Sequence, residues 1–151
     1  MNLKWLIVFI LLFFSSGCKQ GYYTHQVNCL ESTSQTISLR CTGIGKDRYS
    51  AINDAEKAAF NTLLFKGVPS SQQKDALISY NESECIKENN KYFNNLFSKG
   101  HYKTFITTSV PVSELTHCRG TMKMITVDVQ INIYSLRKDL EQNNIIRAFG
   151  Y

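Results

Sequence analysis

Two segments of the chain alternate between apolar and polar residues with a period of two. In Thr36 to Thr42 the apolar positions are Ile37, Leu39 and Cys41. In Met122 to Tyr134 they are Ile125, Val127, Val129, Ile131 and Ile133. Because successive side chains of a strand point to opposite faces, each segment predicts a strand with one buried face. A third strand is predicted from Tyr102 to Val112, followed by a turn over residues 116–120.

Helical periodicity appears between these strands. Over Tyr49 to Lys66 one apolar face contains Ile52, Ala55, Ala59 and Leu63, which predicts an amphipathic helix. Asp47 or Ser50 is suited to cap its start, and Gly67 follows its end. Two more helices are predicted, from Glu84 to Ser98 and from Leu136 to Asn143.

The element order β-α-α-β-β-α predicts an α+β fold: a small antiparallel sheet with helices packed on one face. We expect one domain over residues 36–151. Residues 18–35 are polar and lack helical periodicity, so they predict a flexible tether. The alternative is that a short extended piece near Val27 to Leu30 joins the edge of the sheet.

The N-terminus has the order of residues found in a bacterial secretory signal. Lys4 precedes an apolar run from Trp5 to Phe14, and the small residues 15–17 lead directly to Cys18. The run is shorter than the roughly 20 residues that a membrane span needs. The sequence FSSGC resembles the lipobox of bacterial lipoproteins, with Ser15 in place of the usual leucine. We therefore predict that residues 1–17 are a signal peptide and that Cys18 is the lipidated residue, carrying acyl chains such as palmitate. A plain cleaved signal and an uncleaved anchor are the alternatives.

Charge and sorting signals suggest where the mature protein resides. In Gram-negative bacteria, an aspartate directly after the lipidated cysteine disfavours transport of a lipoprotein to the outer membrane. This position is Lys19 here, so we expect an outer-membrane lipoprotein facing the periplasm. The net charge is +5. No run of Lys or Arg exceeds two residues, and no basic stripe alternates with aromatic residues, which argues against nucleic-acid binding. Attraction to an anionic cell-wall polymer is an open alternative.

Four cysteines follow Cys18, and an oxidising compartment would allow up to two disulfides among them. They are Cys29, Cys41, Cys85 and Cys118. Three pairings are open; we favour Cys29 with Cys41 and Cys85 with Cys118, and buried free thiols are the alternative.

No catalytic or metal-binding motif is present in the sequence. Gly43-Ile44-Gly45 lacks the remaining residues of a phosphate-binding loop, so we interpret it as a tight turn or bulge that ends the first strand. There is no C-x-x-C, G-x-S-x-G or H-E-x-x-H. A nucleophilic pair of Cys85 or Cys118 with His101 has no local signature. We therefore predict a non-enzymatic protein without a cofactor or metal.

Polar residues follow the solvent-facing positions of the last long strand. They are Thr126, Asp128, Gln130 and Asn132. This row is either a solvated surface or a face that binds a partner, and we name it as the candidate partner face.

Several of these features resemble a known family. The strand ending in Gly43 and Gly45, the alanine-rich helix closed by Gly67, and the late strand with Val127, Val129 and Ile131 are similar to small envelope lipoproteins related to the N-terminal domain of the flagellar assembly protein T. A short cysteine-anchored lipoprotein with one α+β domain also resembles outer-membrane lipoproteins of secretion complexes. The resemblance implies an assembly or accessory protein of the envelope, held on the membrane by its lipid and bound to other envelope proteins. The alternative is a lipoprotein that binds cell wall or a small ligand.

Overall fold

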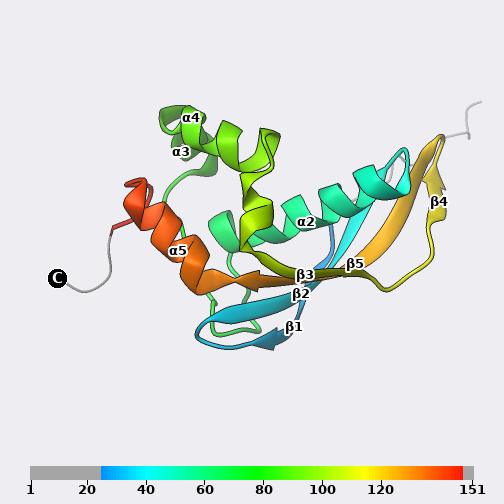
Figure 1. The fold of residues 1–151 in the computed structure, drawn as a ribbon, viewed down its shortest axis with the longest axis horizontal. Coiled ribbons are helices and arrows are strands. Elements are labelled where there is room, and N and C mark those ends of the chain that lie inside the picture. The colour runs from blue at the N-terminus through cyan, green and yellow to red at the C-terminus, as the bar shows by residue number, and fades with distance from the viewer. Residues whose placement is uncertain (1–24, 148–151) are drawn as a thin grey trace, which may run out of the picture.

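The structure is a computed structural model and describes residues 25–147 of the chain. They form a five-stranded antiparallel sheet in the order β1-β2-β5-β3, with β4 also pairing with β5. The helices lie on one side of this sheet (Figure 1). The predicted α+β class is therefore confirmed. The strands are β1 (Val27–Ser32), β2 (Thr36–Gly45), β3 (Ile106–Pro111), β4 (Thr116–Arg119) and β5 (Met122–Asn132), and the helices are α2 (Arg48–Phe65), α3 (Glu82–Glu88), α4 (Asn90–Phe93) and α5 (Ile133–Gln142).

The two strands with the clearest alternation pair at the centre of the sheet. Leu39 lies opposite Val129, and Cys41 lies opposite Val127. The apolar positions of both strands are fully buried beneath α2, as the period-two pattern predicts; they are Ile37, Leu39, Cys41, Ile125, Val127, Val129 and Ile131. β5 ends at Asn132, two residues before the predicted end, because the side chain of Asn132 accepts a hydrogen bond from Ser135 N and caps α5.

Part of the predicted tether belongs to the sheet. β1 pairs with β2 from Val27 to Ser32, so the tether predicted over residues 18–35 is wrong for this stretch, and the alternative of a strand at the sheet edge is correct. An edge strand hydrogen-bonds on one side only. In β1 only Val27, Cys29 and Ser32 are partly buried, which explains its polar composition. The predicted turn at residues 116–120 also contains a strand: β4 pairs with the beginning of β5 around Gly120.

The glycines at the end of β2 allow the helix to approach the sheet closely. The strand continues through Gly45, so our interpretation of Gly43-Ile44-Gly45 as a turn or bulge that ends the strand is wrong. A Cβ atom at Gly43 would lie 2.1 Å from the carbonyl oxygen of Ala51 and 2.4 Å from the backbone nitrogen of Ala55. Residues without a side chain are needed here because α2 packs its alanine face directly on β2.

The ends of α2 follow the sequence signals, whereas the second predicted helix is broken. Asp47 caps α2 and accepts a hydrogen bond from Ser50 N at 2.8 Å, and Gly67 adopts a positive φ of 74° beyond the other end. Instead of one helix over residues 84–98, α3 ends at Glu88 and is followed by α4, a π-helical turn (Asn94–Ser98) and a 3-10 helix (His101–Phe105). The four asparagines at positions 89, 90, 94 and 95 disfavour an uninterrupted helix.

Candidate functional site

The predicted partner face lies on the side of the sheet opposite α2. Thr126, Asp128, Gln130 and Asn132 alternate with the buried residues of β5 and are all half-buried. Asp128 accepts two hydrogen bonds from Arg40 of β2, from Nε to Oδ1 and from a terminal nitrogen to Oδ2, each 2.7 Å long. These two parallel hydrogen bonds hold the guanidinium group and the carboxylate in one plane and fix their relative orientation. Asn132, in contrast, is occupied as the cap of α5.

Sequence reasoning missed two apolar residues of the same face. Val110 lies opposite Asp128 in the register of β3 and β5 and is 53% exposed. Val112 donates its backbone N–H to Thr126 O and is 44% exposed. Their two-residue spacing in the predicted strand was the available signal. We call the surface formed by Arg40, Val110, Val112, Thr126, Asp128 and Gln130 the outer sheet face.

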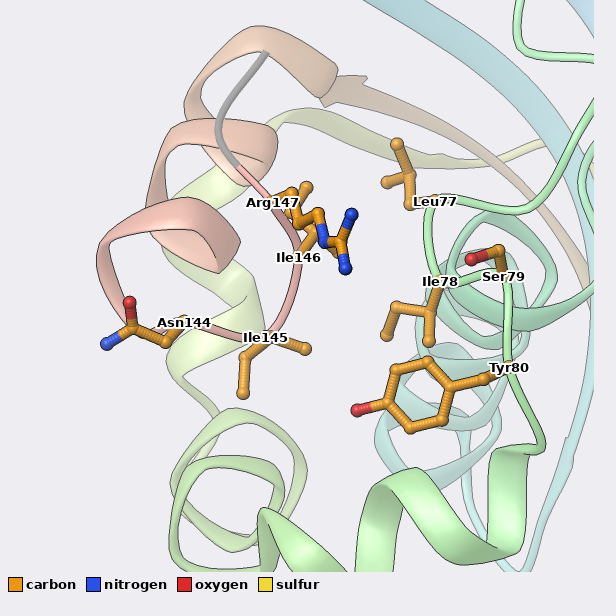
Figure 2. Close-up of a pocket in the computed structure, with 8 residues that line it drawn as sticks. All are labelled: Leu77, Ile78, Ser79, Tyr80, Asn144, Ile145, Ile146 and Arg147. Carbon is orange, nitrogen blue, oxygen red and sulfur yellow. The ribbon is translucent and has the colours of Figure 1, made fainter. Parts of the chain in front are cut away.

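A sizeable cavity lies away from the sheet. It has a volume of about 680 Å³ and separates the segment 77–80 from the segment 144–147 (Figure 2). Most of the side chains that line it are apolar or aromatic, and the guanidinium group of Arg147 points into it (Figure 2). We call it the Arg147 pocket.

A smaller and more polar cavity lies between α2 and the residues around the 3-10 helix. Its volume is about 280 Å³, and three lysines line it: Lys57, Lys99 and Lys103. Within residues 25–147, neither Lys57 nor Lys99 forms an ion pair. Tyr49 is 70% exposed at the rim, and the ammonium of Lys103 lies 5.1 Å from the centre of its ring. We call this cavity the lysine pocket.

The buried carboxylate of Glu56 lies next to Lys103, one of the residues that line the lysine pocket. Glu56 of α2 is only 5% exposed and accepts hydrogen bonds from Ser109 Oγ at 2.7 Å and from Tyr102 Oη at 3.2 Å. Lys103 Nζ lies 3.9 Å from Glu56 Oε2 and donates to Asn53 Oδ1 at 2.6 Å. Burial and the neighbouring Glu56 raise the pKa of Tyr102. These contacts hold Lys103 at the lysine pocket. They also give the charges of Lys103 and Glu56 a polar partner each.

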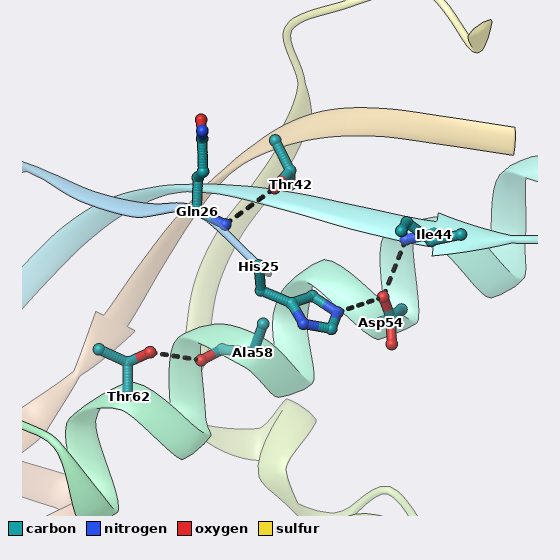
Figure 3. Close-up of polar contacts among 7 residues, drawn as sticks. All are labelled: His25, Gln26, Thr42, Ile44, Asp54, Ala58 and Thr62. Atoms are coloured by element: carbon teal, nitrogen blue, oxygen red, sulfur yellow. Dashed lines mark hydrogen bonds and ion pairs between the residues drawn. The ribbon is translucent and has the colours of Figure 1, made fainter. Parts of the chain in front are cut away.

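His25 joins the segment before β1 to the middle of α2 (Figure 3). Its Nε2 atom lies 2.7 Å from Asp54 Oδ2, and the same oxygen accepts the backbone N–H of Ile44 at 2.8 Å. Gln26 N donates to Thr42 Oγ1 at 3.1 Å. His25, which the sequence places in the tether, therefore has a structural contact in the domain. His101, the candidate partner of a nucleophilic cysteine, lies 3.6 Å from a carboxylate oxygen of Asp139.

The structure contains the four cysteines after Cys18 as free thiols. The pairing of Cys85 with Cys118 is wrong, because α3 and β4 lie at opposite ends of the molecule (Figure 1). Cys29 and Cys41 are on neighbouring strands but are not directly opposite: Cys29 faces Leu39 across the ladder. Burial, and to a smaller extent the charge of Asp128, raise the pKa of Cys41 to about 12, which makes it a poor nucleophile at neutral pH.

Cys18 and the apolar run at residues 5–14 lie outside the described residues. Over residues 25–147, no helix combines the length and hydrophobicity that crossing a membrane requires. The same part of the chain contains no group of three or more His, Cys, Asp or Glu side chains placed to hold a metal ion.

Comparison with known proteins gives no family assignment. No protein-family model matches the chain, and no curated protein or solved structure matches it. The resemblance to lipoproteins related to the N-terminal domain of flagellar assembly protein T therefore remains a prediction from residues of the sequence.

Proposed function

We propose that this protein is a lipid-anchored, non-enzymatic subunit or accessory factor of an envelope assembly, of the secretion or motility type. The signal sequence ending at Cys18 supports the anchor and a position on the periplasmic side of the outer membrane. The observation that carries the proposal of a binding role is the outer sheet face, which exposes Val110 and Val112 beside a fixed ion pair. The proposed partner is another envelope protein.

The chemistry of the outer sheet face suits protein recognition. Exposed valines provide apolar area that a partner can bury, whereas the Arg40–Asp128 pair offers donors and acceptors in a defined orientation. Most of the face belongs to β2 and β5 at the centre of the sheet, and β3 with Val110, like Val112 directly after it, is hydrogen-bonded to β5. A partner would therefore meet a surface held by the sheet and would lose little conformational entropy on binding it.

We expect Val110→Gln combined with Val112→Gln to reduce co-purification of the partner at least tenfold. The change removes apolar area but adds no charge opposite Asp128. Recovery is measured by quantitative mass spectrometry after gentle detergent extraction and cross-linking of native membranes. Tyr134→Gln, which alters a residue of α5 that is 51% exposed, is the matched control and should leave recovery unchanged.

Two outcomes would contradict the proposal. One is a monomeric protein without partners in the extract; the other is an equal loss in the control variant. Mass spectrometry of the mature N-terminus in the same preparation tests the anchor, because acylated Cys18 is expected and an unmodified Cys18 is incompatible with it.

A cell-wall binding role is the second candidate, and the lysine pocket favours it. The ammonium groups of Lys57 and Lys99, which form no ion pair within residues 25–147, lie beside the exposed Tyr49 and suit an acidic saccharide. Co-sedimentation with purified peptidoglycan distinguishes the candidates. Retention that is lost in Lys57→Gln combined with Lys99→Gln would support wall binding, and absence of retention would exclude it.

A further inference from the structure

The Arg147 pocket has the size and the rigid walls of a small-molecule site. Its volume of about 680 Å³ falls within the range of about 300 to 1,000 Å³ that is typical of such sites. One wall is fixed to α2, because Leu77 N and Ile78 N donate to Leu63 O and Leu64 O at 3.0 and 2.9 Å. The opposite wall is fixed to α5 through the hydrogen bond from Ile145 N to Leu140 O at 2.9 Å.

The two walls present mainly apolar side chains to the cavity. Ile78 and Tyr80 extend from one segment toward Ile145 on the other (Figure 2). Ile78 and Ile145 are only 2% and 5% exposed, so they belong to the core at the base of the cavity, and the accessible apolar surface is that of Leu77, Tyr80 and Ile146. A ligand with an aliphatic or aromatic body would bury its apolar surface here at little cost in reorganisation of the protein.

Arg147 provides the main charged group of the cavity. Its guanidinium group projects between the two walls, whereas the side chain of Asn144 points away from the gap (Figure 2). Within residues 25–147, none of the residues that line the cavity is acidic. Among residues 25–147, Arg147 has no ion-pair or hydrogen-bond partner. A guanidinium group offers five donors and no acceptor, which favours a carboxylate bound through two parallel hydrogen bonds.

We propose that the Arg147 pocket binds a small amphipathic carboxylate, with its apolar body against Leu77, Tyr80 and Ile146 and its carboxylate on Arg147. A free fatty acid and an acidic product of lipid breakdown share this chemistry. The site is independent of the outer sheet face, so either proposal stands if the other fails.

The test uses hexanoate and its neutral analogue hexanamide with the full-length lipidated protein in nanodiscs. Methyl NMR signals of Ile78, Ile145 and Ile146 report on the cavity itself, and empty nanodiscs give the free concentration of each ligand. We expect hexanoate to shift these methyl signals in a saturable manner, with at least tenfold tighter binding than hexanamide. Arg147→Gln should abolish this preference, whereas Lys138→Gln, which removes an exposed cation of α5, should preserve it.

Acetate and butyrate, measured in the same way, determine whether the apolar body contributes. Affinity should rise with chain length, because each added methylene enters the cavity. A neutral ligand that binds as tightly as hexanoate, or the absence of saturable shifts at the three isoleucines, would overturn the proposal. It would also be overturned if hexanoate bound only after Phe149→Ser and Tyr151→Ser, since the chain's own C-terminal residues would then be the occupant.

Discussion

Gly43→Ala is expected to lower the free energy of unfolding by about 3 kcal/mol, because overpacking a well-packed interface costs about 1 to 3 kcal/mol or more. The added methyl group would lie 2.1 Å from Ala51 O and 2.4 Å from Ala55 N. Both are backbone atoms of α2, so a side-chain rotation cannot relieve the overlap. The helix would have to move away from β2 and lose part of its contact with the sheet. Urea denaturation followed by circular dichroism measures the change.

Gly100→Ala is the control for this experiment. Gly100 has a positive φ of 79°, but a Cβ atom there would meet nothing within 4 Å. The expected cost is therefore conformational strain alone, about 1 kcal/mol. If Gly43→Ala were no more destabilising than Gly100→Ala, the result would contradict the close packing of α2 against β2 at Gly43.

Glu56→Ala should destabilise the protein by about 3 kcal/mol, since removing one partner of a buried charged pair costs about 3 to 5 kcal/mol and Lys103 is partly exposed here. The hydroxyl groups of Ser109 and Tyr102 would lose their acceptor in the interior. Glu56→Gln keeps an oxygen acceptor and should cost about 1 to 2 kcal/mol. Both values come from the same urea titration.

A double-mutant cycle with Ser109→Ala isolates the shorter of these hydrogen bonds. We expect a coupling energy of about 1 to 2 kcal/mol, because the acceptor is a carboxylate. Glu114→Ala, at an exposed loop residue, should change stability by less than about 0.5 kcal/mol. Equal effects at positions 56 and 114 would show that Glu56 has no role in the interior.

The central strands could be predicted from the sequence because one of their faces is completely buried. Burial of every second residue in β2 and β5 produces an alternation that no other structure explains as well. The sequence of β1 resembles a tether because few side chains of an edge strand are buried, so the alternation of apolar and polar residues is weak. The glycines of β2 were assigned to a turn because glycine favours turns and close packing alike, and only the position of α2 distinguishes these two roles.

The candidate sites also differ in how far they can be predicted from the sequence. The row from Thr126 to Asn132 follows from one strand, so its common face could be predicted. The Arg147 pocket and the lysine pocket each join segments that are distant in the sequence, and no local pattern places such segments together. Glu56 was detectable in principle: it follows Ile52 by four residues on the apolar stripe of α2, where a carboxylate needs buried partners.

The contact of His25 with Asp54 limits how far the domain can stand from the membrane. With the lipid on Cys18, as we propose, six residues lie between the anchor and His25, so the chain covers this distance in seven residue-to-residue steps. A fully extended chain of this length spans about 25 Å, whereas a tether reaching Thr36 would span about 60 Å. The tether between Cys18 and the domain is thus less than half as long as the sequence predicts. If the domain is anchored through Cys18 as proposed, this short connection would hold His25 within about 25 Å of the bilayer surface. A partner would then have to reach the domain close to that membrane.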